Sequence, residues 1–130
     1  MSYYVDRMLA ALHQETLVIA IQDRVLRTDL NLNIQAEWED AFTPLALSLD
    51  ETGRVFLIVR AETETGVERH ALWVLTPQGE RVIDLEIPAH PAGVYTPPLV
   101  GYDHQVYILL GNEVMAVGPE GETRWTKNTG

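Results

Sequence analysis

The sequence predicts an all-β protein built from about three copies of one antiparallel unit of three or four strands. Short, nearly unbroken apolar runs rich in β-branched residues recur along the chain. Turns that contain Pro and Gly, and polar segments with alternating side chains, follow these runs at similar distances. Apolar runs this short, bounded by turn residues, are typical of strands and too short for most buried helices.

The three apolar runs predict the central strand of each unit. They are Leu17 to Ile21, Val55 to Val59 and Val106 to Leu110. A strand with no polar side needs cover on both faces. We therefore expect the three sheets to stack face against face, so that each sheet covers the central strand of its neighbour.

The remaining strands are predicted on either side of each central run. First strands are expected at Met8 to His13, Pro44 to Leu49 and Pro98 to Tyr102. Third strands are expected at Val25 to Asp29, Ala71 to Thr76 and Val114 to Gly118. Outer strands are expected at Ile34 to Glu39, Arg81 to Ile87 and Glu122 to Thr126, where charged residues alternate as on an exposed sheet edge.

Two turns between third and outer strands have matching sequences, Thr76-Pro-Gln-Gly79 and Gly118-Pro-Glu-Gly121. Proline presets φ for the start of a turn, and glycine takes the positive φ that closes it. These two segments are therefore predicted as tight turns that connect antiparallel strands.

Counting along the chain places the units in one frame. Val106 lies 89 residues after Leu17, and Val114 lies 89 residues after Val25. The middle unit contains nine extra residues between its second and third strands, close to the polar run Ala61 to Arg69. Repeats tolerate insertions best at turns, so this run is predicted to be a longer hairpin loop.

The frame also divides the chain. Residues 1–7 are expected to be an N-terminal strand or a linker. Residues 8–130 are expected to form one repeat domain, with units at about 8–40, 41–90 and 91–130.

The segment from Met115 to Trp125 resembles the repeat of pyrroloquinoline-quinone-type (quinoprotein-like) β-propellers, in which an apolar strand reaches a Pro turn, then Gly, then Trp. The middle copy keeps the turn and has Ile83 where the Trp would fall, and the first copy has Trp38 two residues late and no Gly. The resemblance covers about residues 8–130 and implies propeller-type antiparallel blades. Many propellers of this type bind no quinone, so it implies no particular cofactor.

Three blades are fewer than the four or so that a closed propeller needs. The chain is therefore predicted to be either a partial propeller that is part of a longer one, or half of a closed ring that a homodimer forms. A third possibility is a β-sandwich or a twisted stack without central closure.

Charge excludes some partners. The net charge is −10, and the nine Lys and Arg residues are dispersed, so nucleic acid is not an expected partner.

No apolar run approaches the roughly 18 residues of a membrane span, and the first 20 residues show no signal-peptide pattern. We expect no membrane insertion, and the sequence does not indicate the compartment. The chain has no cysteine.

The sequence contains no recognisable catalytic motif, and neither a cofactor nor a metal site is expected. Its two serines, Ser2 and Ser48, lie outside any Gly-x-Ser-x-Gly elbow. The histidines show none of the spacings typical of metal ligands; they are His13, His70, His90 and His104.

One set of residues forms a candidate ligand-binding face. His13, Asp50 and Asp103 lie near the turn between first and second strands in successive units. Equivalent turns of stacked blades lie at the same end of the stack, so these side chains could converge there.

The sequence favours a non-catalytic binding or scaffold module whose partner is another protein, with a second copy of itself among the candidates. The alternative is a fragment or subunit of a quinone-dependent oxidoreductase propeller. The resemblance implies that such an enzyme would need a calcium site of carboxylates and an amide, plus an aromatic platform. The sequence does not locate that set.

Overall fold

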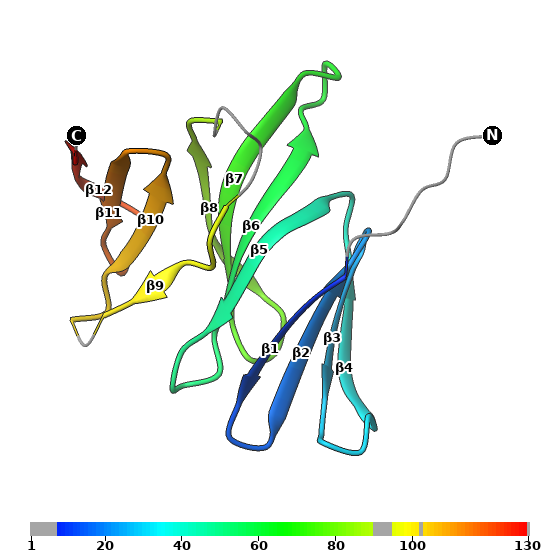
Figure 1. Cartoon of the computed structure of the whole chain (residues 1–130). Coiled ribbons are helices and arrows are strands. Elements are labelled where there is room, and N and C mark those ends of the chain that lie inside the picture. Colours follow the sequence, from blue (N-terminus) through cyan, green and yellow to red (C-terminus); the bar gives the residue numbers. More distant parts are fainter. Residues whose placement is uncertain (1–7, 90–94, 102, 130) are drawn as a thin grey trace.

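The computed structural model describes residues 8–89, 95–101 and 103–129, and these form an all-β structure of three separate sheets (Figure 1). Each sheet is antiparallel and has four strands in sequential order. The described residues contain no helix, and so none that could cross a membrane. The predicted strand content is confirmed, and three separate sheets are not a two-sheet sandwich. Tyr102 and His90 lie outside the described residues.

The strand bounds are close to the predicted ones. The first sheet contains β1 (Leu9–His13), β2 (Thr16–Ile21), β3 (Arg24–Thr28) and β4 (Ile34–Glu39). The middle sheet contains β5 (Thr43–Leu49), β6 (Val55–Glu62), β7 (Glu68–Leu75) and β8 (Arg81–Ile87). The third sheet contains β9 (Leu99–Val100), β10 (Val106–Leu110), β11 (Glu113–Val117) and β12 (Thr123–Asn128).

The middle sheet lies between the other two and is covered on both faces (Figure 1). Leu57 and Trp73 point to the first sheet, where they pack in one cluster with Val18 and Val25. On the opposite face, other side chains of β6 and β7 pack in a second cluster with Val106, Ile108 and Val117 of the third sheet. Because side chains alternate along a strand, every residue from Val55 to Val59 is buried.

The three sheets stack face against face as predicted, and the central strands of the two terminal sheets are buried on one face. In β2 only Val18 and Ala20 are buried, and in β10 every second residue is buried. Each terminal sheet has one neighbour in the structure, so half of its apolar side chains face outward.

The nine-residue insertion was predicted to be a longer hairpin loop, and this prediction was wrong. It extends two strands instead. Ala61 pairs with Arg69 and Glu62 pairs with Glu68, so only residues 63–67 form the turn. The hairpin rises beyond the rest of the middle sheet (Figure 1). Polar side chains are compatible with strands here because this part of the hairpin lies beyond the stacked core.

One five-residue turn recurs between strands. Its first residue donates and accepts backbone hydrogen bonds, and its fourth residue has positive φ. The fourth residues are Leu32, Gly53, Gly66, Gly79, His104 and Gly121. Glycine adopts positive φ without steric cost, so Leu32 and His104 are the two that carry strain among these turns.

These glycines also serve contacts between neighbouring sheets. Nε1 of Trp38 in the first sheet donates to the carbonyl of Gln78 at 2.8 Å, and its ring lies over Gly79. A Cβ on Gly79 would lie 1.1 Å from Nε1 of Trp38. One sheet later, Ile83 packs over Gly121, where a Cβ would lie 3.1 Å from its Cγ2. An outer-strand side chain therefore docks on the glycine turn of the next sheet at both junctions.

Candidate functional site

Turns between first and second strands gather at one end of the stack, the lower end in Figure 1. A hollow of about 380 Å³ lies there, and we name it the lower hollow. Its lining residues come from all three sheets: His13, Leu49, Asp50, Glu51, Val100, Gly101 and His104. Of the three predicted residues, His13 and Asp50 line the hollow. Asp103 lies in an adjoining turn but is not among the lining residues.

Asp50 holds its own turn together. Its Oδ1 accepts hydrogen bonds from the backbone N–H groups of Thr52 and Arg54 and from the Thr52 hydroxyl, all within 2.9 Å. Its Oδ2 accepts from Nε of Arg54 at 3.1 Å. Burial raises the pKa of Asp50, but these hydrogen bonds outweigh it and the pKa lies below the usual value. The carboxylate is therefore ionised at neutral pH and fully engaged within the protein.

Asp103 organises the corresponding turn of the third sheet. Its carboxylate accepts from the backbone and side chain of Gln105 and from the hydroxyl of Tyr107, with distances from 2.7 to 3.3 Å. The backbone hydrogen bond from Gln105 is the main reason that the pKa of Asp103 lies below its usual value. The side chain stabilises its own turn and is not directed at a ligand in the lower hollow.

His13 ends β1 at the rim of the same hollow. Its Nε2 is buried and has no hydrogen-bond partner within the described structure. His13 as a whole residue is partly exposed at this rim.

These residues do not fit a calcium and quinone pair of the kind that the resemblance implies for the enzyme. Among the described residues, no three His, Cys, Asp or Glu side chains are grouped as metal ligands would be. The oxygens of Asp50 and Asp103 already accept hydrogen bonds within their turns. We therefore derive no chemistry from such a group.

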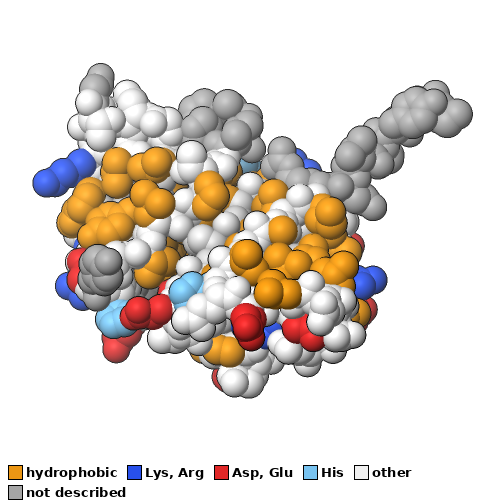
Figure 2. All heavy atoms as spheres, turned by 60° about the horizontal axis from the view of Figure 1, so that its bottom comes forward, with side chains coloured by type: hydrophobic (Ala, Val, Ile, Leu, Met, Phe, Trp, Pro, Cys, Tyr) orange, Lys and Arg blue, Asp and Glu red, His pale blue; other side chains and the backbone are white. Residues whose placement is uncertain are grey.

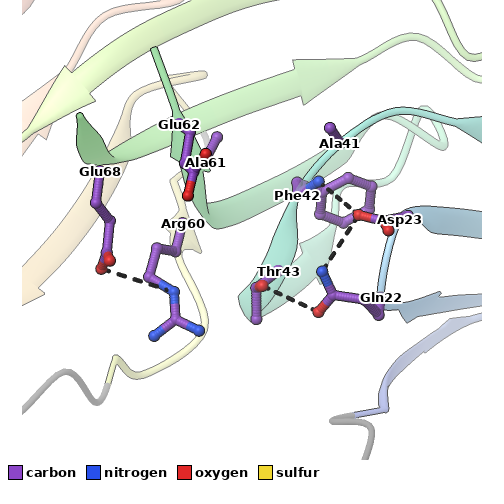
Figure 3. Close-up of a pocket in the computed structure, with 9 residues that line it drawn as sticks. All are labelled: Gln22, Asp23, Ala41, Phe42, Thr43, Arg60, Ala61, Glu62 and Glu68. Carbon is purple, nitrogen blue, oxygen red and sulfur yellow. Dashed lines mark hydrogen bonds and ion pairs between the residues drawn. The ribbon is translucent and has the colours of Figure 1, made fainter. Parts of the chain in front are cut away.

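A second hollow, of about 480 Å³, lies at the opposite end between the first and middle sheets (Figure 3). Its walls are the turn after β2, the start of β5 and the extended hairpin of β6 and β7. Figure 3 shows its polar groups paired with one another: Arg60 with Glu68 at 3.7 Å, and Thr43 with Gln22 at 2.9 Å. The repeat frame identified the nine extra residues that form the hairpin wall of this hollow, but it did not predict a pocket beside them.

The outward side of the third sheet carries apolar side chains that no other described sheet covers. Leu99, Tyr107, Ala116 and Trp125 are register partners in one row across its four strands. The rings of Tyr107 and Trp125 have centroids 6.1 Å apart and leave Ala116 with no exposed surface. Leu99 is 55% exposed and Trp125 is 38% exposed. We call this row, with Leu109 and Val114 beside it, the third-sheet face.

The same row in the middle sheet is covered. Ser48, Phe56, Val74 and Ile83 are its register partners, in the order of the third-sheet row. Phe56 is 2% exposed and Val74 is 0% exposed, because the third sheet packs on them. The third-sheet face is thus the equivalent of a surface that elsewhere in this protein is buried by the next sheet.

The outward side of the first sheet is also apolar. Ala10, Ile19 and Leu26 form one row, with Leu12 and Leu17 in the next. Figure 2 shows hydrophobic side chains spread over the third sheet on the left of the view and over the first sheet on the right. Monomeric proteins seldom leave large connected apolar areas in water, so such areas indicate interaction sites.

Comparison with known proteins supports the fold class. No family model matches the chain, and no curated protein matches it. A protein of unknown function from Bacteroides caccae aligns with a TM-score of 0.66 and 8% identity, over 93% of this chain and 45% of that chain. BamB from Moraxella catarrhalis aligns with a TM-score of 0.67 and 14% identity, over 99% of this chain and 38% of that chain.

At these identities the likeness shows the fold alone. The three sheets are propeller-type blades, as the sequence predicted, and the chain spans less than half the length of both solved chains. The predicted face at the first turns contains a hollow, whereas the third-sheet face was missed. Its sequence signal was available in the apolar outward residues of the third unit, among them Tyr107 and Leu109.

Proposed function

We propose that this chain is a non-catalytic, propeller-type module that binds another protein through the third-sheet face. The row Leu99, Tyr107, Ala116 and Trp125 carries the proposal, because its counterpart in the middle sheet is buried by a neighbouring sheet. Aromatic and aliphatic side chains on a flat sheet face offer the apolar centre that a protein interface requires. Lys127, with its Nζ 5.2 Å from the Trp125 ring centroid, supplies a cationic group at the edge.

The arrangement of polar side chains favours binding over catalysis. Ser48, the one serine among the described residues, donates its hydroxyl hydrogen bond to the carbonyl of Pro98 at 2.7 Å. The carboxylates of Asp50 and Asp103 are engaged in turns. Neither hollow therefore presents a nucleophile next to a base among the described residues, which is the arrangement that covalent catalysis needs.

We also propose that the repeat is of the quinoprotein-like type. In support, Trp38 and Ile83 each dock on the glycine of the following turn. Trp125 follows the third glycine turn at the position of Ile83, as the strand registers show.

Photo-crosslinking in the native cell tests the binding function. A benzophenone amino acid placed at Leu99 should give a discrete adduct with another protein, because that side chain is 55% exposed on the third-sheet face. The matched control places the same group at Val67, which is 60% exposed at the tip of the long hairpin. No adduct from position 99, or the same adduct from both positions, would show that this face is not the binding surface.

A further inference from the structure

We infer that the third-sheet face takes one kind of partner: an apolar antiparallel blade, from another stretch of polypeptide, with glycine at the fourth position of its turn between third and outer strands. The inference rests on the proposed function and adds the chemistry of the partner. It also assigns Leu32 the role of preventing a second copy of this chain from occupying that face.

Both junctions of this protein place an outer-strand side chain on the glycine turn of the next sheet. Trp38 lies over Gly79, and Ile83 lies over Gly121, each across the gap to the next sheet. Both glycines hold the fourth position of the recurrent five-residue turn, with φ of 92° and 89°. At Gly79 the Trp38 ring occupies the space where a Cβ would stand, and at Gly121 an added Cβ would be in tight contact with Ile83, so a turn with a bare backbone fits both junctions best.

Trp125 stands on the third sheet where Ile83 stands on the middle sheet. Trp125 pairs with Ala116 as Ile83 pairs with Val74, one sheet earlier. Its ring faces outward from the third sheet and is 38% exposed. Trp125 therefore holds the strand position of Ile83, whereas the counterpart of Trp38, which pairs with Val25, is Lys127. A glycine turn that receives Trp125 would have to come from a further blade.

The first sheet of a second copy is one candidate for that further blade. Its equivalent turn, Asp29 to Asn33, has the same backbone hydrogen bonds, and its fourth residue is Leu32 with φ of 65°. At Gly121 a single added carbon would already come within 3.1 Å of the smaller Ile83 side chain. Leu32 adds four carbons at that position, and Trp125 is larger than Ile83. The two cannot occupy the junction together in the arrangement seen twice within the chain.

The outward side of the first sheet is otherwise suited to such a junction. Leu17 is equivalent to Val55 and Val106, which face the preceding sheet and are 0% and 3% exposed. Ile19 and Leu26 continue the apolar surface beside it. This turn departs from the receiving turns of the other two sheets by Leu30 in place of Pro and by Leu32 in place of Gly. Leu32 is the residue at the position on which Trp38 and Ile83 dock, and natural β-proteins use such features against unwanted self-association.

Replacement of Leu32 tests the inference. The Leu32→Gly variant should associate with itself, with a dissociation constant at least ten-fold lower than that of the wild-type chain, measured by sedimentation over a range of concentrations. Leu32→Ala, which keeps a Cβ, is the matched control, and its dissociation constant should equal that of the wild-type chain. Adding Trp125→Ala to Leu32→Gly should abolish the gain, and circular dichroism checks that all variants fold.

Two results would overturn the inference. One is a wild-type dimer that Trp125→Ala disrupts, which would make a second copy the partner. The other is a Leu32→Gly variant that associates no better than Leu32→Ala, which would show that glycine is not what the face requires. Neither result depends on the crosslink from Leu99, so failure of the binding function is seen separately.

Discussion

The middle sheet and the third sheet have the same strand order and the same kinds of turn, but only the middle sheet is covered on both faces. In the middle sheet the row of Phe56 and Val74 is buried, whereas in the third sheet the equivalent row of Tyr107 and Trp125 faces outward. Local sequence forms each sheet, but the number of neighbours decides how much of its apolar surface is buried. The outward sides of the two terminal sheets are apolar surfaces that no other described sheet covers.

The largest expected effect comes from removing a side chain that lies between two sheets and comparing it with the removal of one that faces outward. Ile58→Ala should lower the free energy of unfolding by about 3 to 4 kcal/mol, because Ile58 is fully buried between the middle and third sheets. Ile19→Ala, on the outward side of the first sheet, should cost about 1 kcal/mol, because that side chain is only partly buried. Urea unfolding followed by circular dichroism measures both. Equal losses would mean that the first sheet's outward side is covered in solution.

A second test addresses the docking of Trp38. Gly79→Ala should destabilise by about 2 to 3 kcal/mol, since the new methyl group meets the Trp38 ring in addition to the strain at positive φ. Gly66→Ala is the matched control, because it has a φ of 81° and no atoms within 4 Å of the added Cβ. It should cost about 1 kcal/mol. Equal costs of the two variants would contradict docking of Trp38 on this turn.

The strands were predictable because each unit carries its own local signals. Val106 to Leu110 and Arg81 to Ile87 have the predicted bounds, since an apolar run or an alternating run flanked by turn residues specifies a strand without help from the rest of the chain. The extension of β6 and β7 was not predictable from composition. Glu62 and Glu68 are poor strand formers, and their pairing depends on the hairpin that the strands below them have already begun.

The candidate site was predictable in part. The repeat frame placed His13 and Asp50 at one end of the stack, and they do line the lower hollow. Sequence did not show that the Asp50 carboxylate is engaged by Thr52 and Arg54, because an Asp in a turn can equally face solvent. Nor did it separate Trp38, which is docked, from Trp125, which is not. That difference depends on whether a following sheet is present.

A third test compares the two turn aspartates. Asp50→Asn should cost about 1 to 2 kcal/mol at pH 7, because the ionised Oδ2 that accepts from Arg54 is replaced in a buried turn. Asp103→Asn should cost less, since its turn is exposed. The pKa of Asp50 is lowered in the folded state, so its ionised form stabilises the fold above the usual aspartate pKa of about 3.9.

That contribution is lost as the pH falls through the lowered pKa of the folded state. The difference in unfolding free energy between wild type and Asp50→Asn should therefore shrink as the pH is reduced below about 5. Urea titrations at several pH values measure it. A difference that grows on acidification would show that the pKa of Asp50 is not lowered by folding.

The smallest expected effect has the opposite sign and concerns the same turn in two sheets. Gly53 and His104 both hold the fourth, positive-φ position, with φ of 88° and 62°. His104→Gly should raise the free energy of unfolding by about 0.5 to 1 kcal/mol, because relief of left-handed strain exceeds the added entropy of the unfolded chain. His104→Asn, a residue that tolerates this conformation, should give a smaller gain. Thermal unfolding at neutral pH measures both variants, and a loss of stability in His104→Gly would show that the imidazole makes a contact outweighing its backbone strain.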